Sequence, residues 1–186
     1  MQNTIKAGSI THLTDARFFA AYNVDYIGFC FDPQSASYIA PDRASAIRGW
    51  VTGPKIVAEF AHQDADNLKN IVDYLQPDVI QIPAAEWPVL KETILALNKP
   101  VIIAFGQEEI PVTQSGNIIY YLMPELMPIP AGIAPAECMF ELQEPYDHFE
   151  IPPGTAIHIK GTPEDATGIK AYDAIADWLE AISRIT

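Results

Sequence analysis

The sequence predicts a shortened (β/α)₈ barrel that occupies residues 1–186 as a single domain. Short apolar runs alternate with helical patterns, which is typical of a parallel sheet with crossover helices. Eight such runs can be counted, and eight parallel strands close this kind of barrel. Barrels of this class rarely fall below roughly 200 residues, so we expect some helices to be reduced to loops.

The first half of the chain carries the clearest elements. We expect strands at 4–10, 26–31, 55–60, 79–82 and 101–105, and helices at 15–22, 41–51, 64–75 and 88–97. Thr14 is expected to cap the first helix, Asp64 to open the third, and Pro41 suits a first helical turn. The apolar residues of the third helix recur at i, i+3, i+4 and i+7, which predicts one buried face.

The second half is less regular. Residues 118–123, 138–142 and 155–159 are expected to be strands, and 172–183 a final helix. Seven of the 16 prolines lie between Pro124 and Pro153, where they would break any long helix. The helices after strands five to seven are therefore expected to be loops. The apolar strand 118–122 would then need a cover, either the proline-rich segment or a second subunit in a homodimer.

Charge and composition exclude several classes of function. The net charge is −13, and no Lys or Arg occurs between Lys99 and Lys160. This excess argues against a nucleic-acid partner and would repel phosphate unless backbone amides compensated. We expect no membrane span, because no apolar run approaches the roughly 18 residues required. The absence of a secretory pattern and the two cysteines favour a cytoplasmic protein without a metal or cofactor.

Residues Lys6–Pro41 carry a recognisable order of motifs: IKAGSIT, a helix, YIGFCF and DPQSASYIAP. This order resembles the opening of phosphoribosylanthranilate isomerase, whose first strand usually ends K-I-C-G-I-T and whose second loop usually reads S-P-R-Y. The stretch DNLKNIVDYLQPDVIQIPAAE and the C-terminal GIKAYDAIADWLEAI are also similar to that family. The resemblance covers roughly two-thirds of the chain. It implies the barrel fold and an Amadori isomerisation in tryptophan biosynthesis.

The same resemblance implies a degenerate active site. Gly8 stands where the family keeps its catalytic cysteine, and Ser37 where it keeps an arginine. Leu122 or Met123 stands where a catalytic aspartate is expected at the end of strand six. Of the family's phosphate-binding turns, only Gly161 remains. By family position, the substrate-binding candidates are Gly8, Ser37, Gln81, Lys160 and Gly161.

Charged residues inside predicted strands suggest a second kind of site, because burying a charge is costly unless it is paired or used. These residues are Lys6, Glu59, Glu141, His158 and Lys160. Ser9, beside Gly8, can donate a hydrogen bond to a ligand or cap local backbone. Lys6 and Glu59 can form a general acid/base couple or a ligand clamp at the barrel mouth. The alternative is a layer of ion pairs that fills the barrel. His12, in the loop after the first strand, can be a catalytic base or a solvated side chain.

Three functions therefore stay open. The first is a divergent barrel that lacks the ordinary isomerase activity and binds a small molecule or a protein partner. The second is an active isomerase that uses non-standard acid/base residues such as Glu125 or His12. The third is a different small-molecule enzyme built on Lys6 and Glu59, with Gln81 beside them.

Overall fold

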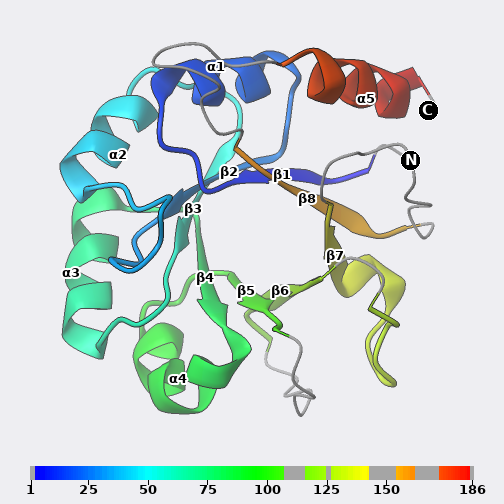
Figure 1. Cartoon of the computed structure of the whole chain (residues 1–186). Helices are drawn as coiled ribbons and strands as arrows, with labels where there is room; N and C mark the ends of the chain where they lie inside the picture. Colours follow the sequence, from blue (N-terminus) through cyan, green and yellow to red (C-terminus); the bar gives the residue numbers. More distant parts are fainter. Residues whose placement is uncertain (1–2, 107–115, 125–126, 143–153, 162–171, 185–186) are drawn as a thin grey trace.

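The computed structural model describes residues 3–106, 116–124, 127–142, 154–161 and 172–184. Eight parallel strands form a closed barrel in chain order, and β8 pairs with β1 (Figure 1). The predicted barrel is thus confirmed. The strands are β1 Ile5–Gly8, β2 Tyr26–Cys30, β3 Lys55–Glu59, β4 Val79–Pro83, β5 Val101–Ala104, β6 Ile118–Met123, β7 Cys138–Glu141 and β8 Ala156–Lys160.

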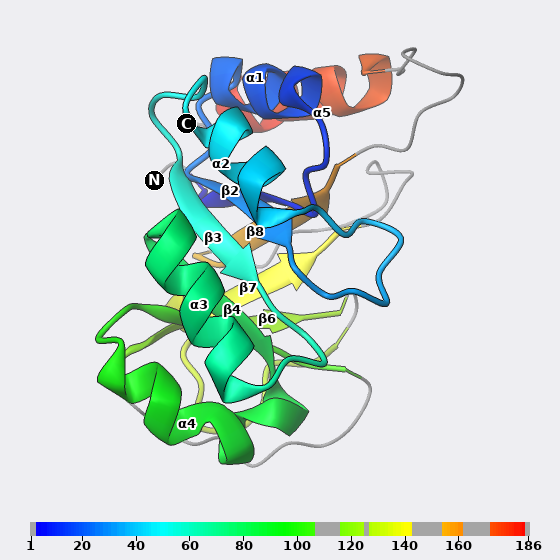
Figure 2. The same cartoon turned by 90° about the vertical axis from the view of Figure 1, so that its left-hand side faces the viewer.

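The helices cover the barrel unevenly. They are α1 Leu13–Ala21, α2 Pro41–Arg48, α3 Ala65–Leu75, α4 Trp87–Ala96 and α5 Asp173–Arg184, with 3₁₀ turns η1 Ala84–Glu86 and η2 Pro135–Glu137. The first four α-helices follow β1 to β4 and line one side of the barrel (Figure 2). Between β5 and β8, the described residues contain the short η2 and no α-helix. The expectation of a reduced helical wall is therefore met in the described part of the chain.

Local signals explain where two helices begin. Asp64 caps α3, because its side chain accepts a hydrogen bond from the Asn67 amide at 2.7 Å. The prediction that Thr14 caps α1 is wrong. His12 is the last extended residue before α1, and its carbonyl already accepts a hydrogen bond from the Ala16 amide at 3.2 Å. The helix therefore begins before Thr14 can act as a cap.

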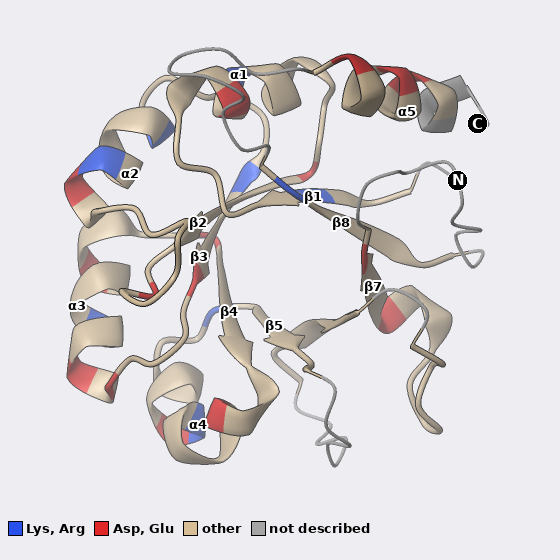
Figure 3. Cartoon of the chain, in the orientation of Figure 1, with Lys and Arg blue, Asp and Glu red and all other residues tan. Residues whose placement is uncertain are grey.

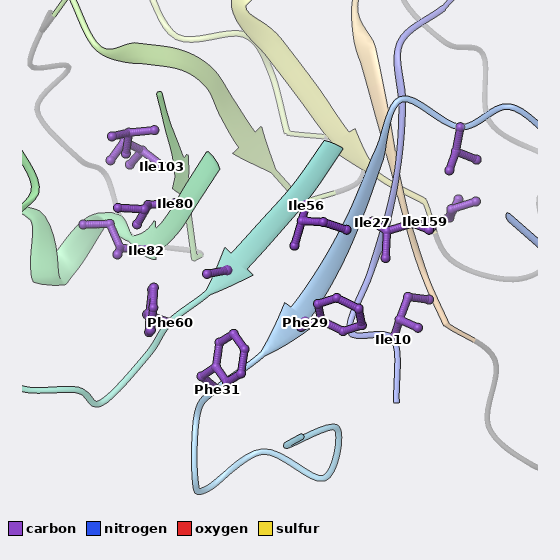
Figure 4. Packing of buried hydrophobic residues seen from close by; sticks show 14 of the residues in the cluster. Ile10, Ile27, Phe29, Phe31, Ile56, Phe60, Ile80, Ile82, Ile103 and Ile159 are labelled. Atoms are coloured by element: carbon purple, nitrogen blue, oxygen red, sulfur yellow. The ribbon is translucent and has the colours of Figure 1, made fainter. Parts of the chain in front are cut away.

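Successive side chains of each strand point to opposite faces of the sheet, and two separate hydrophobic cores result. One lies between the strands and the helices and contains Ile27, Phe29 and Ile80 (Figure 4). The other fills the barrel interior and consists of Tyr26, Val57, Val79, Ile102, Leu122, Met139 and Ala156. Burying such side chains contributes about 1.5–3 kcal/mol each.

The strand β6 divides its side chains between these cores. Tyr120 packs against the interior cluster, whereas Tyr121 and Met123 are buried in the outer one. Ile118 at the start of the strand is only partly buried. The predicted homodimer that would cover this side of the barrel stays a prediction.

None of the helices in the described ranges is both long enough and apolar enough to cross a membrane. Asp and Glu residues occur on all five α-helices and on β7, while Lys and Arg residues occur on α1, α2, α3, α4 and β1 (Figure 3). The negative charge is therefore distributed around the molecule.

The C-terminal helix lies beside α1 (Figures 1 and 2). The Tyr172 hydroxyl, just before α5, donates a hydrogen bond to Asp15 Oδ1 at 2.5 Å. Its ring stacks on Phe18 with the centroids 4.2 Å apart. Because Asp15 is buried, this contact ties the end of the chain to its beginning.

Replacing Tyr172 by Phe should therefore loosen α5. The change keeps the stacked ring but removes a hydrogen bond to a buried carboxylate, which we expect to cost about 1.5–3 kcal/mol. Hydrogen exchange of the α5 amides measures the effect. Tyr74→Phe, at an exposed tyrosine on α3, is the matched control. Equal exchange in both variants would contradict the role given to Tyr172.

Candidate functional site

Three charged or titratable side chains meet inside the barrel. Lys6 of β1 donates a hydrogen bond to Glu59 Oε1 of β3, and its Nζ lies 3.1 Å from His158 Nδ1 of β8. All three are buried, with exposed fractions of 0%, 5% and 2% respectively. The structure therefore brings together three of the charged or titratable strand residues that the sequence singled out.

Further polar contacts extend from these three side chains toward the carboxyl ends of the strands. Glu141 Oε1 accepts a hydrogen bond from Lys160 Nζ at 2.7 Å, and its Oε2 lies 3.9 Å from His158 Nε2. On the other side, Ser9 donates to Glu59 Oε2 from its amide at 2.9 Å and from its hydroxyl at 3.3 Å. We call these six residues the inner polar cluster: Lys6, Ser9, Glu59, Glu141, His158 and Lys160.

Burial shifts the pKa values of two members of the inner polar cluster, His158 and Lys6. It lowers the pKa of the His158 imidazole well below the ordinary 6.5, and the charges of Lys6 and Lys160 lower it further. Burial also lowers the pKa of Lys6, although the charge of Glu59 and the hydrogen bond to it oppose that shift. A neutral His158 accepts a hydrogen bond from the Lys6 ammonium at Nδ1 and carries its own proton on Nε2, which faces Glu141. We assign this tautomer from the hydrogen-bond partners.

A neutral buried histidine makes stability depend on pH. Below about pH 6.5 the unfolded chain binds a proton at His158, whereas the folded protein resists it. The corresponding stability is fully present above pH 6.5. It is lost as the pH falls from this value through the lower pKa of His158 in the folded protein. We expect His158→Gln to flatten the pH dependence of the unfolding free energy by up to about 1.4 kcal/mol per pH unit.

Urea unfolding at several pH values between 4.5 and 7.5 measures this slope. His62→Gln, which removes an exposed imidazole, is the control. If both variants changed the slope equally, the pH dependence would not come from burial of His158.

Two glycines make room for the inner polar cluster. A Cβ atom on Gly8 would lie less than 3.0 Å from Glu59, His158 and Lys6. A Cβ atom on Gly28 would lie less than 3.0 Å from Glu59. Real Cβ atoms essentially never approach other atoms so closely, so the side chains around these positions would have to move. The cluster thus occupies the space that side chains at these two positions would need.

The other family-position candidates lie around this cluster. Gln81 pairs in register with Glu59, and its buried Oε1 has no hydrogen-bond partner among the described residues. Gly161 follows β8, and its amide donates to the Gly8 carbonyl at 2.8 Å. That amide is therefore engaged in the barrel. Ser37 lies in the loop after β2, where its amide donates to the Ser35 hydroxyl at 3.1 Å.

The remaining candidates are placed elsewhere or outside the described residues. His12 immediately precedes α1, and its Nδ1 lies 3.2 Å from the Arg43 guanidinium. Glu125 falls outside the described residues. No group of three His, Cys, Asp or Glu side chains in the described ranges is arranged to hold a metal ion.

A surface pocket of about 340 Å³ lies at the amino ends of β2 and β3. Its lining includes Asn23, Asp25, Gly53 and Lys55, which precede or begin β2 and β3. The inner polar cluster instead lies toward the strands' carboxyl ends, where barrels of this class carry their active sites. We therefore place the candidate site at the cluster.

The sequence left two roles open for Ser9, and the structure shows it as a donor to Glu59. Its φ of 56° places a non-glycine residue in the left-handed region, which turns its amide toward Glu59. A serine directly after the first strand does not by itself signal such a backbone. Lys6 and Gly8 are two residues apart on β1, and so are His158 and Lys160 on β8. Because side chains alternate along a strand, each pair points to the same side of the sheet, the inside of the barrel.

Comparisons with known proteins converge on one family. The family model described as N-(5'phosphoribosyl)anthranilate (PRA) isomerase matches residues 5–118. The N-(5'-phosphoribosyl)anthranilate isomerase of Rhizobium meliloti (strain 1021) is 37% identical over 91 residues, which are 48% of this chain and 42% of that protein. The Brucella canis isomerase is 37% identical over 89 residues, 45% of this chain and 39% of that protein. The matched stretch is thus less than half the length of each curated relative.

Solved structures extend the similarity of fold to the whole barrel. The phosphoribosyl anthranilate isomerase of Thermus thermophilus aligns with a TM-score of 0.72 at 20% identity, covering 98% of this chain and 100% of that one. The enzyme of Thermococcus kodakaraensis gives 0.66 at 12% identity, covering 98% and 99%. At such identities, the likeness describes the fold.

Proposed function

Because the chain belongs to the N-(5'-phosphoribosyl)anthranilate isomerase family, we propose that it is a divergent member without the ordinary Amadori isomerase activity, and that it binds a small molecule at the barrel mouth. The observation that carries this proposal is the environment of Gly8. The resemblance assigns the catalytic cysteine to that position. Here the position carries no ionisable side chain, and Glu59, His158 and Lys6 fill the space beside it.

The chemistry of the family makes this loss severe. An Amadori rearrangement needs a general acid at the ring oxygen and a general base at the neighbouring carbon. Each such group typically contributes about 10²–10⁴-fold to the rate. Glycine cannot supply either proton transfer.

The carboxyl end of β6 supports the same conclusion. The resemblance places the second catalytic group here, an aspartate. Leu122 packs in the barrel interior and Met123 in the outer core, and neither side chain can transfer a proton. The engaged amide of Gly161 likewise favours a structural role over phosphate binding.

The burial of Lys6 and Glu59 argues against a new reaction built on this pair. Lys6 has no solvent-exposed surface and Glu59 is 5% exposed, so a substrate has little access to either group. Their contact supports the interpretation that the ion pair fills the barrel. We therefore favour binding over a second catalytic function.

Complementation of an isomerase-deficient tryptophan auxotroph tests the proposed function. We expect no growth without tryptophan when this chain is expressed. The Thermus thermophilus isomerase is the positive control, and an immunoblot of the soluble fraction establishes that the tested protein is present. Growth supported by this chain would overturn the proposal.

A further inference from the structure

The Glu59 carboxylate is bound in the way a protein binds a carboxylate ligand. Its Oε1 accepts a hydrogen bond from the Lys6 ammonium. Its Oε2 accepts two more, from the Ser9 amide at 2.9 Å and the Ser9 hydroxyl at 3.3 Å. One cation and two neutral donors therefore converge on one anion, an arrangement that gives short, strong hydrogen bonds.

The surroundings show that these donors are held in place around the carboxylate. Ser9 adopts a left-handed backbone with φ of 56°, which is uncommon outside glycine and directs its amide toward Glu59. Gly8 of β1 and Gly28 of β2 lack the side chains that would collide with the carboxylate. Lys6 is fully buried, and its Nζ also lies 3.1 Å from His158 Nδ1, which further fixes the ammonium.

We propose that Lys6 and Ser9 form a carboxylate-binding site inside the barrel, that the chain fills this site with its own Glu59, and that the emptied site takes a small monocarboxylate. The site requires only these donors and the space beside the two glycines. It is therefore independent of whether any isomerase activity remains.

Acetate is the ligand that fits best. Glu59→Ala removes one methylene carbon, the carboxyl carbon and its two oxygens, while Lys6 and Ser9 stay. Acetate has the same two carbons and two oxygens. It can therefore replace the missing group atom for atom, whereas propionate carries one carbon more.

Thermal unfolding of Glu59→Ala in sodium acetate and in sodium chloride at equal ionic strength tests the site. We expect a lower melting temperature than wild type in chloride and a partial recovery in acetate. At an acetate concentration about ten times its Kd, the folding equilibrium should shift about tenfold toward the native state. Propionate should recover less than acetate.

Two controls separate this binding from a general salt effect. Wild type keeps Glu59 in the site and should show no greater stability in acetate than in chloride. Lys6→Met combined with Glu59→Ala lacks the cation and should also show no recovery. Equal responses of Glu59→Ala, the double variant and wild type would overturn the proposal.

The test remains decisive if Glu59→Ala does not fold in chloride. The variant is then refolded from urea into acetate or into chloride, and the soluble yields are compared. A higher yield in acetate, absent from the double variant, supports the site. Equal yields in the two salts would contradict it.

Discussion

Replacing Gly8 by cysteine, the residue that the family resemblance assigns to this position, should destabilise the protein by about 3 kcal/mol, the upper part of the range for overpacking a filled interior. The new Cβ would lie less than 3.0 Å from Glu59, His158 and Lys6. These side chains are buried and bonded to one another, so none can move without breaking a contact. Urea unfolding under reducing conditions measures the loss.

Gly106→Cys provides the matched control, because no heavy atom of the described residues, apart from those of Gly106 and its chain neighbours, lies within 4 Å of a Cβ built there. It introduces the same side chain without a collision, so we expect a change of less than about 0.5 kcal/mol. If Gly8→Cys were as stable as Gly106→Cys, the inner polar cluster would not fill the space beside Gly8. We also expect Gly8→Cys to form no ketose product from phosphoribosylanthranilate, as proposed for the wild type.

Breaking the buried ion pair from one side should have the largest effect on stability. Lys6→Met leaves the Glu59 carboxylate buried without its cation, which we expect to cost about 3–5 kcal/mol. Adding Glu59→Gln removes the unpaired charge while keeping the side-chain volume. The double variant should therefore recover most of the loss, and a double-mutant cycle by urea unfolding measures the coupling.

A second Lys–Glu pair of the same cluster offers the control. Lys160 Nζ lies 2.7 Å from Glu141 Oε1, but its side chain is 57% exposed. Solvent screens such a pair, so Lys160→Met should cost no more than about 1 kcal/mol. Similar losses for Lys6→Met and Lys160→Met would mean that burial does not govern the strength of these contacts.

The barrel could be predicted from sequence because its signals are local. Alternating apolar runs predict strands, the spacing of Leu68, Ile71 and Val72 predicts the buried face of α3, and the Asp64 cap marks where that helix begins. The prolines between Pro124 and Pro153 predicted the reduced wall for the same reason. The start of α1 was missed, since the His12 carbonyl rather than the Thr14 side chain bonds its first turn.

The inner polar cluster was only partly predictable because it depends on closure of the barrel. Lys6 and His158 meet because β1 pairs with β8, which lies 152 residues away in the sequence. The alternation within each strand shows which residues point inward, but the register between strands decides which of them touch. Ser9 required a further step, since the left-handed backbone that turns its amide toward Glu59 has no local signal in the sequence.

An assay of the purified protein with phosphoribosylanthranilate tests the central claim most directly. Formation of the ketose product is followed by chromatography and mass spectrometry, with buffer alone and the Thermus thermophilus isomerase as references. The occupied space beside Gly8 and the apolar end of β6 predict no product above the buffer rate. Catalytic turnover that rises in proportion to the concentration of this protein would contradict the account.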